Sequence, residues 1–296
     1  MNNKFSLFFY FEKILFTPNR FDFIPIILLS PFSVIYCIFT FLNSFRKHLV
    51  RKKFSAKIIG VGNLVLGGTG KTPLIIALAK NEKNIAVVLR GYGRISKGLV
   101  LVSQNGKIIV DVSQSGDEAF LYAEKIPNST IIVSENRELG ILKAQELGHS
   151  VIFLDDSYRQ HQIIKDIEYI ILEKSKNWLC IPAGAYREKL WFFKKNIKIF
   201  RENIDFWREV IIENKTKKMV LITAISKPHR LNKYISDEVP KYIFPDHYPF
   251  TKLEIETIIN NEKATSILTT EKDLVKFKDF NFNISLIKLE IKFIQN

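Results

Sequence analysis

A glycine-rich run in the first third of the chain has the residue types of a phosphate-binding loop. The run reads GGTGKT over residues 67–72, and it follows an apolar, strand-like segment at residues 56–62. In such loops backbone N–H groups surround the phosphates, and the N-terminus of the following helix adds partial positive charge. The predicted nucleotide-binding residues are Gly67, Gly68, Thr69, Gly70, Lys71 and Thr72.

Two side chains of this loop have predicted roles of their own. Lys71 is expected to reach the β- and γ-phosphates of ATP, and Thr72 is expected to hold Mg²⁺ through its hydroxyl. A strict G-x-x-x-x-G-K-T pattern has glycine where this chain has Val65. A chance glycine turn before a helix is therefore the alternative.

A second apolar run, residues 150–154, ends in two carboxylates, Asp155 and Asp156. A strand that ends in aspartate often supplies the carboxylate near the metal of a nucleotide site. We therefore expect these two residues to lie near Mg²⁺. An exposed Asp-Asp turn is the alternative interpretation.

Acid–base candidates lie in two other segments. Asp117 and Glu118 follow Gly116 at an expected helix start, where carboxylates either cap the helix or act as a general base and a metal ligand. His247 follows Asp246 in a turn flanked by prolines. It is a candidate proton partner. A histidine in a surface loop is the alternative.

The segments around these residues alternate between strand and helix patterns. Strands are expected at 85–89 and 131–133 and a hairpin over 99–110, while helices are expected from 117 and over 137–147. This alternation predicts an α/β fold with a mostly parallel sheet flanked by helices, as in P-loop nucleotide-binding proteins. Ligands of such sheets collect at the carboxyl ends of the strands.

The N-terminal fifty residues have a different character. Residues 23–42 carry no charge, and Arg46, Lys47, Arg51, Lys52 and Lys53 follow them. Twenty helical residues span about 30 Å, and the basic flank is expected on the cytoplasmic side. A cleaved signal peptide, a buried soluble helix and a half-inserted helix are the alternatives. Phe5 to Phe11 could add an interfacial segment, so we expect membrane association rather than a defined span.

Composition sets limits on the class of protein. The 296 residues carry 44 Lys and Arg against 30 Asp and Glu, a net charge of +14, and 47% of the residues are hydrophobic. These values exclude a wholly disordered chain and a polytopic membrane protein. The two cysteines exclude a disulfide framework and a cysteine-based zinc site. The positive charge requires an acidic partner, and no nucleic-acid readout motif is present.

Taken in order, the motifs resemble those of the tetraacyldisaccharide 4′-kinase family of Gram-negative bacteria. The matching stretches are VGNLVLGGTGKTP (61–73), RGYGR (90–94), GDEA (116–119), LDD (154–156), PAGAYRE (182–188), ISKPHR (225–230), FPDHY (244–248) and TTEKD (269–273). The hydrophobic N-terminus also resembles the family's membrane helix. The chain departs from the family pattern after Asp156, where Gln160 and His161 are displaced by one residue, and within PAGAYRE.

The resemblance implies a reaction and its residues. The γ-phosphate of ATP would pass to the 4′-hydroxyl of a tetraacyl glucosamine disaccharide 1-phosphate, giving lipid IVA. The implied catalytic residues are the base Asp117, its partner His247, and Lys71. The implied metal ligands are Thr72, Glu118, Asp155 and Asp156. Tyr92, Arg137 and Arg187 are candidates for binding the acceptor headgroup.

The resemblance also implies an architecture and a location. Residues 1–50 are the predicted membrane-associated segment, 51–217 the P-loop kinase domain with a connecting region, and 218–296 a smaller C-terminal α/β domain. The partners implied are the anionic glycolipid and the cytoplasmic face of the inner membrane, with no nucleic acid and no obligate protein partner. A membrane-associated P-loop ATPase switch of the partitioning or metal-chaperone type is the alternative. The signature lysine of those switches would fall at Leu66, which counts against them.

Overall fold

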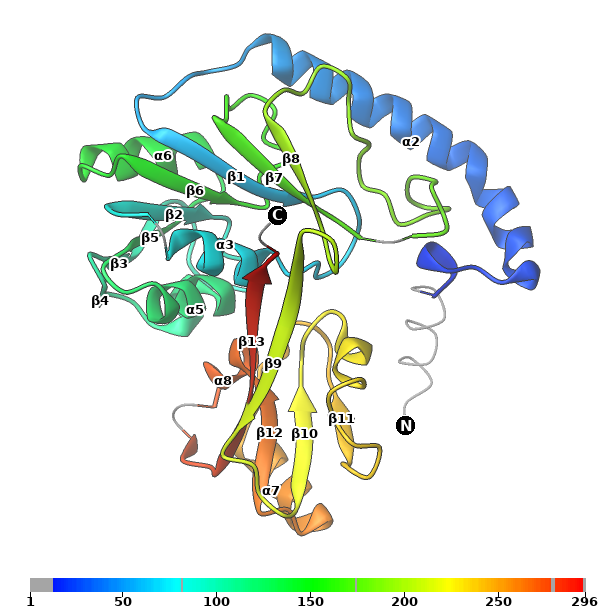
Figure 1. The fold of residues 1–296 in the computed structure, drawn as a ribbon, viewed down its shortest axis with the longest axis vertical. Coiled ribbons are helices and arrows are strands. Elements are labelled where there is room, and N and C mark those ends of the chain that lie inside the picture. Colours follow the sequence, from blue (N-terminus) through cyan, green and yellow to red (C-terminus); the bar gives the residue numbers. More distant parts are fainter. Residues whose placement is uncertain (1–12, 81, 174, 278–279, 295–296) are drawn as a thin grey trace.

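The computed structural model of the chain describes residues 13–80, 82–173, 175–277 and 280–294. Two lobes, each built on its own sheet, are joined by a long two-stranded ribbon (Figure 1). The larger lobe carries the glycine-rich loop, and the smaller lobe contains most of the C-terminal third of the chain. The segment Phe5 to Phe11 lies outside the described residues.

The sheet of the larger lobe has eight strands in the order β4-β3-β5-β2-β6-β1-β7-β8. All neighbouring strands run parallel except β3, which is antiparallel to both β4 and β5. The strands are β1 (Lys57–Asn63), β2 (Ile85–Leu89), β3 (Val100–Gln104), β4 (Lys107–Ile108), β5 (Thr130–Val133), β6 (Val151–Asp155), β7 (Ile167–Leu172) and β8 (Ile197–Arg201). The predicted mostly parallel sheet is therefore confirmed, and its hairpin is β3–β4.

Helices cover both faces of this sheet. On one face, α3 (Lys71–Ala79) and α5 (Asp117–Lys125) pack Leu74, Ile75 and Tyr122 onto the strands. On the other face, α6 (Arg137–Glu146) packs Ile141 and Ala144 against the alternate strand residues. The short α4 (Val112–Ser115) precedes α5. Two-sided burial explains why these strands read as continuous apolar runs in the sequence.

The smaller lobe has five strands in the order β11-β10-β12-β13-β9. Only β9 runs antiparallel to its neighbour. The elements are β9 (Phe206–Glu213), β10 (Met219–Thr223), β11 (Lys241–Ile243), β12 (Ser266–Thr270), β13 (Ile284–Phe293), α7 (Lys252–Glu262), α8 (Glu271–Leu274) and the 3₁₀ turn η2 (Pro228–Leu231). Helix α7 covers one face of this sheet through Ile255 and Ile258.

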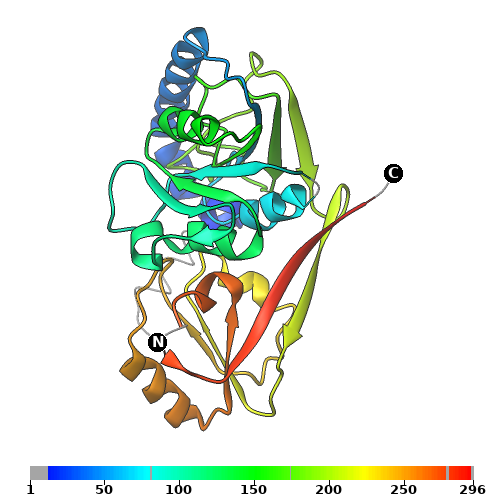
Figure 2. The same cartoon turned by 90° about the vertical axis from the view of Figure 1, so that its left-hand side faces the viewer.

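The β9–β13 ribbon belongs to both lobes. Residues 206–213 pair with residues 286–293 along the edge of the second sheet. At the upper end of the ribbon, Phe206 and Ile291 are buried in the core of the larger lobe (Figures 1 and 2). The predicted boundary at residue 217 thus falls after β9, although β9 is an edge strand of the second sheet. We propose that the second unit begins within residues 202–206.

The uncharged N-terminal segment forms one long helix, α2 (Phe23–Leu49), preceded by the 3₁₀ turn η1 (Arg20–Asp22). Among the described residues, it is the helix long and apolar enough to cross a membrane, with a mean hydropathy of 2.1. It lies along the side of the larger lobe (Figure 1). Its small polar side chains Ser33, Thr40 and Ser44 are buried against the lobe, while most of its large apolar side chains are exposed.

Candidate active site

The glycine-rich loop lies between β1 and α3, where the sequence predicts a phosphate-binding loop. Gly70 directly precedes α3 as its N-cap and has φ of 86°, in the left-handed region that favours glycine. The Lys71 Nζ lies 3.4 Å from Oδ1 of Asp156 and 3.4 Å from Oδ1 of Asn63. The amine therefore reaches back over the loop toward the end of β6, the strand next to β1.

The two aspartates at the end of β6 have opposite electrostatic environments. Asp155 is buried and accepts a hydrogen bond from the Tyr122 hydroxyl at 3.1 Å. Its burial and the nearby Glu118 carboxylate raise the pKa of Asp155 to about 6. Burial also acts on Asp156, but the charges of Lys71 and Arg187 outweigh it and lower the pKa of Asp156 to about 2.

Asp117 and His247 come from different lobes and meet at 3.1 Å. Asp117 is the first residue of α5, and His247 lies in the loop after β11 with φ of 63°. Oδ2 of Asp117 contacts both Nδ1 of His247 and Nζ of Lys276, each at 3.1 Å. Burial raises the pKa of Asp117, but these two partners outweigh the burial, so the net shift is downward. The structure thus joins residues that lie 130 positions apart.

Two lysines that the sequence analysis did not assign complete this region. Lys276 contacts Asp117, and Lys272 lies 3.5 Å from Glu118 and 3.0 Å from Asp246. Burial lowers the pKa of Lys272, but these carboxylates outweigh it and raise the pKa above its usual value. Lys272 lies in α8 and within the TTEKD stretch, and Lys276 lies just after α8. The sequence signal for them was two lysines, four residues apart, directly after the strand β12.

One cavity of about 330 Å³ brings most of the predicted residues together. It opens where β1, β2 and β6 end, as expected for a parallel sheet. Its lining includes Gly67, Gly68, Lys71, Tyr92, Glu118, Arg137, Asp155, Asp156, Arg187 and His247. Asp117 is not on the cavity wall and lies behind His247. Thr69, Gly70 and Thr72 line a neighbouring cavity instead.

The three predicted acceptor-binding residues differ in how firmly they are held. Arg187 donates to Oδ1 of Asn63 at 2.7 Å and lies 3.1 Å from Asp156. Arg137 is buried, donates to the Ser134 carbonyl, and has an Nε with no partner among the described residues. Tyr92 is about half exposed on the rim. The buried guanidinium of Arg137 in particular is suited to a phosphate or another anion.

The oxygen atoms near Asp155 fit a magnesium ion that also binds phosphates. Burial, and after it the charges of Asp155 and Glu118, raises the pKa of Tyr122, so these groups share one environment. Within the described ranges, no cation forms a salt bridge with Asp155, and no three His, Cys, Asp or Glu side chains form a complete metal site. Mg²⁺ at nucleotide sites typically takes one or two carboxylates plus phosphates and water.

A second cavity, of about 290 Å³, lies between the lobes beside the glycine-rich loop. Thr72, Pro73 and Leu121 line it from the larger lobe. From the smaller lobe, the apolar side chains of Ile225, Leu231, Tyr234, Ile287 and Leu289 share the lining with polar and charged residues such as Lys233 and Glu271. The apolar part of this lining, next to a phosphate-binding loop, is suited to a planar base. Apart from Thr72, the sequence analysis gave these residues no role, because they come from four separate segments.

His161 lines neither of these two cavities and instead packs inside the larger lobe. It is buried, and its Nε2 lies 3.0 Å from Oε2 of Glu188, whose Oε1 accepts a hydrogen bond from Ser44 of α2. His161 of the displaced Gln-His pair therefore supports the packing of α2 on the larger lobe through Glu188.

The family model for tetraacyldisaccharide-1-P 4′-kinases matches residues 26–296. The chain belongs to this family. Among curated relatives, the tetraacyldisaccharide 4′-kinase of Aliarcobacter butzleri is 46% identical, with 96% of this chain and 93% of the relative covered. The enzyme of Helicobacter acinonychis is 41% identical, with 96% of this chain and 90% of the relative covered. The enzyme of Campylobacter jejuni is 39% identical, with 99% of this chain and 94% of the relative covered.

A solved structure agrees with these relatives. LpxK from Aquifex aeolicus, crystallised in complex with ATP, has a TM-score of 0.70 and 26% identity to this chain, covering 91% of this chain and 95% of the solved one. The resemblance predicted from the motifs is thus confirmed, as are the kinase class and the α/β fold with a second sheet and an N-terminal apolar helix. The ATPase-switch alternative is not favoured.

Proposed function

We propose that the chain transfers the γ-phosphoryl group of ATP to the 4′-hydroxyl of a tetraacyl glucosamine disaccharide 1-phosphate, giving lipid IVA. Family membership supports the reaction. The observation that carries it is the Asp117–His247 hydrogen bond, because it adds a proton acceptor to a cavity that already contains the loop lysine and the paired aspartates. Phosphoryl transfer to an alcohol requires both a group that accepts the hydroxyl proton and charged groups that hold the phosphates.

The Asp117–His247 pair is the proposed catalytic base. His247 lines the cavity and Asp117 lies behind it, so the imidazole is placed to contact the acceptor hydroxyl. Asp117 holds Nδ1 of the ring, orients it, and balances its charge once it takes the proton. Lys276 contacts the same carboxylate oxygen, Oδ2, at 3.1 Å.

ATP is proposed to bind with its phosphates on residues 67–72 and its base against the apolar side chains of the cavity between the lobes. Lys71 would contact the β- and γ-phosphates. Mg²⁺ would be held by Thr72, Glu118 and Asp155, and it supplies charge neutralisation at the phosphates. Asp156 was also predicted as a metal ligand. Since Lys71 and Arg187 both contact its Oδ1, we assign it the role of positioning these cations.

The acceptor is proposed to enter from the side of α2. Arg137, Arg187 and Tyr92 would bind its anionic headgroup within the cavity. Arg187 is also connected to α2, because the Tyr36 hydroxyl donates to its carbonyl at 3.1 Å. A lipid held in a bilayer could thus present its sugars to the cavity while its acyl chains stay beside the helix.

The membrane surface is proposed to contact the outer side of α2 and the adjacent loop. Helix α2 exposes Phe32, Ile35 and Phe39, and the loop exposes Trp178 and Phe192, which are 71% and 83% accessible. An amphipathic helix with aromatic neighbours is typical of proteins that lie in the membrane interface. The basic residues after α2 favour anionic lipids, which agrees with the cytoplasmic face of the inner membrane.

The test is transfer of labelled γ-phosphate from ATP to purified tetraacyl disaccharide 1-phosphate in detergent micelles. The unaltered chain should label the lipid, and Asp117→Ala should not. An enzyme that hydrolyses ATP without labelling the lipid would contradict the proposed acceptor. Lipid labelling that survives Asp117→Ala would contradict the proposed base but not the reaction.

A further inference from the structure

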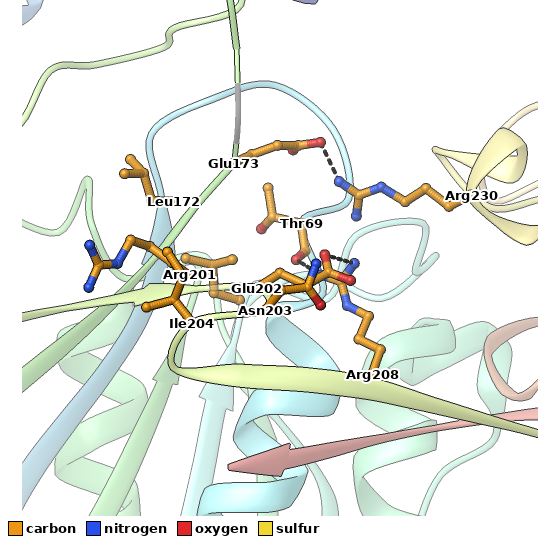
Figure 3. Close-up of a pocket in the computed structure, with 10 residues that line it drawn as sticks. Thr69, Leu172, Glu173, Arg201, Glu202, Asn203, Ile204, Arg208 and Arg230 are labelled. Carbon is orange, nitrogen blue, oxygen red and sulfur yellow. Dashed lines mark hydrogen bonds and ion pairs between the residues drawn. The ribbon is translucent and has the colours of Figure 1, made fainter. Parts of the chain in front are cut away.

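Two arginines of the smaller lobe hydrogen-bond to the main chain of the phosphate-binding loop. Arg208 lies on β9, and its Nη2 donates to the Thr69 carbonyl at 2.8 Å. Arg230 lies on η2, and its Nη1 donates to the Gly68 carbonyl at 3.0 Å. Figure 3 shows both arginine side chains pointing toward the loop at Thr69. The sequence analysis gave neither residue a role.

Each guanidinium is fixed by a carboxylate on its other side. Nη1 of Arg208 lies 2.9 Å from Glu202, and the Arg208 side chain is only 8% exposed. Arg230 pairs with Glu173 (Figure 3). Glu173 also lies 2.7 Å from Nζ of Lys227. These ion pairs hold the donors in place. They also offset the positive charge, so the arginines do not act simply as an added cationic surface.

The two carbonyls belong to the peptide planes whose N–H groups a phosphate would use. In a trans peptide the C=O and the following N–H point in opposite directions. A donor on the Gly68 carbonyl therefore orients the N–H of Thr69, and a donor on the Thr69 carbonyl orients the N–H of Gly70. The approach is close, because a Cβ on Gly70 would lie 2.9 Å from Nη2 of Arg208.

We propose that Arg208 and Arg230 are positioning residues that turn two loop peptides toward the phosphates of the nucleotide. Nucleotide binding is thereby linked to the docking of the smaller lobe on the loop, since the donors come from one lobe and the loop from the other. This inference rests on the proposed binding of ATP at residues 67–72. It adds a role for two arginines that line the cavity between the lobes beside the phosphate-binding loop.

The test measures ADP and ATP binding by calorimetry, using the full chain in detergent. Arg208→Gln and Arg230→Gln should each weaken both nucleotides by the same factor, about tenfold, because both ligands place a β-phosphate on the loop. Arg208→Lys keeps a cationic donor and should recover part of the loss. Arg201→Gln is the matched control. Arg201 lines, with Thr69, Arg208 and Arg230, a cavity of about 310 Å³ (Figure 3), but it pairs with Asp205.

Three results separate the explanations. Unchanged affinity for both nucleotides in folded Arg208→Gln and Arg230→Gln would overturn the proposal. A loss for ATP without a loss for ADP would also overturn it, because that pattern indicates direct contact with the γ-phosphate. If the unaltered chain bound neither nucleotide, the proposed function itself would be wrong. Because the two arginines contact different carbonyls of the loop, the proposal is still tested by one variant if the other misfolds.

Discussion

Asp117→Asn tests the proposed base most directly. The substitution keeps the size of the side chain but removes the negative charge that contacts His247 and Lys276, each at 3.1 Å. At that distance, and at an effective dielectric constant of about 20, opposite unit charges attract by about 5 kcal/mol. Because a quarter of the His247 side chain is exposed, solvent screening reduces the attraction to about 3 kcal/mol.

This attraction stabilises the imidazolium that forms as the acceptor proton is taken up. Losing about 3–5 kcal/mol there should lower kcat by about 10²–10⁴-fold, which is the usual range for a general base. Nucleotide affinity should change by less than about twofold, since Asp117 lies behind the cavity wall and does not line either nucleotide cavity. His247→Ala should give a loss of similar size.

The assay combines phosphate transfer in micelles with calorimetric ATP binding for both single variants and for the double variant. Residues that act as one base should be non-additive, so the double variant should be about as slow as either single one. Losses that multiply in the double variant would show that the two residues act independently. Activity of Asp117→Asn within about threefold of the unaltered chain would refute the reasoning outright.

Three other predictions concern the metal, the loop and the membrane. The Asp155 carboxyl, with a pKa of about 6, must ionise to bind Mg²⁺, so kcat/KM should fall about tenfold per pH unit below that pH. Tyr122→Phe removes a hydrogen bond that lowers this pKa. In that variant the fall in kcat/KM at acid pH should begin at a higher pH. Gly70→Ala should weaken ATP binding by at least about tenfold in calorimetry, because φ is 86° and the new Cβ would press on Arg208. Replacing Trp178 and Phe192 by serine should reduce binding to anionic vesicles about tenfold in a flotation assay, with transfer to micellar substrate kept.

Much of the larger lobe could be predicted because its signals are local. The glycine-rich loop, the strand before it and the helix after it are contiguous, and β2 spans the predicted residues 85–89. Helix α2 likewise follows from an uncharged run. By contrast, β9 has one buried residue among eight, the others being exposed or half-buried, and its partner β13 lies some eighty residues later. No local pattern indicates that such a strand belongs to the second sheet.

The site was only partly predictable for a related reason. Lys71, Asp155 and Asp156 meet because adjacent parallel strands end at the same edge, a rule that applies before the structure is known. Asp117 and His247 meet only because the lobes dock, so their pairing came from the family resemblance. Lys272, Lys276, Arg208 and Arg230 act through contacts with the other lobe. A lysine or arginine in a strongly basic chain gives no signal of such a role.

The ionisation of Asp117 and the docking of the lobes are therefore coupled. Docking buries the carboxylate, and burial alone would raise its pKa and favour the neutral acid. The same docking brings His247 and Lys276, both from the smaller lobe, and their combined effect outweighs the burial. The carboxylate is thus kept charged by the lobe that encloses it. If Arg208 and Arg230 link this docking to the phosphate-binding loop, ATP binding and assembly of the base favour the same arrangement of the lobes.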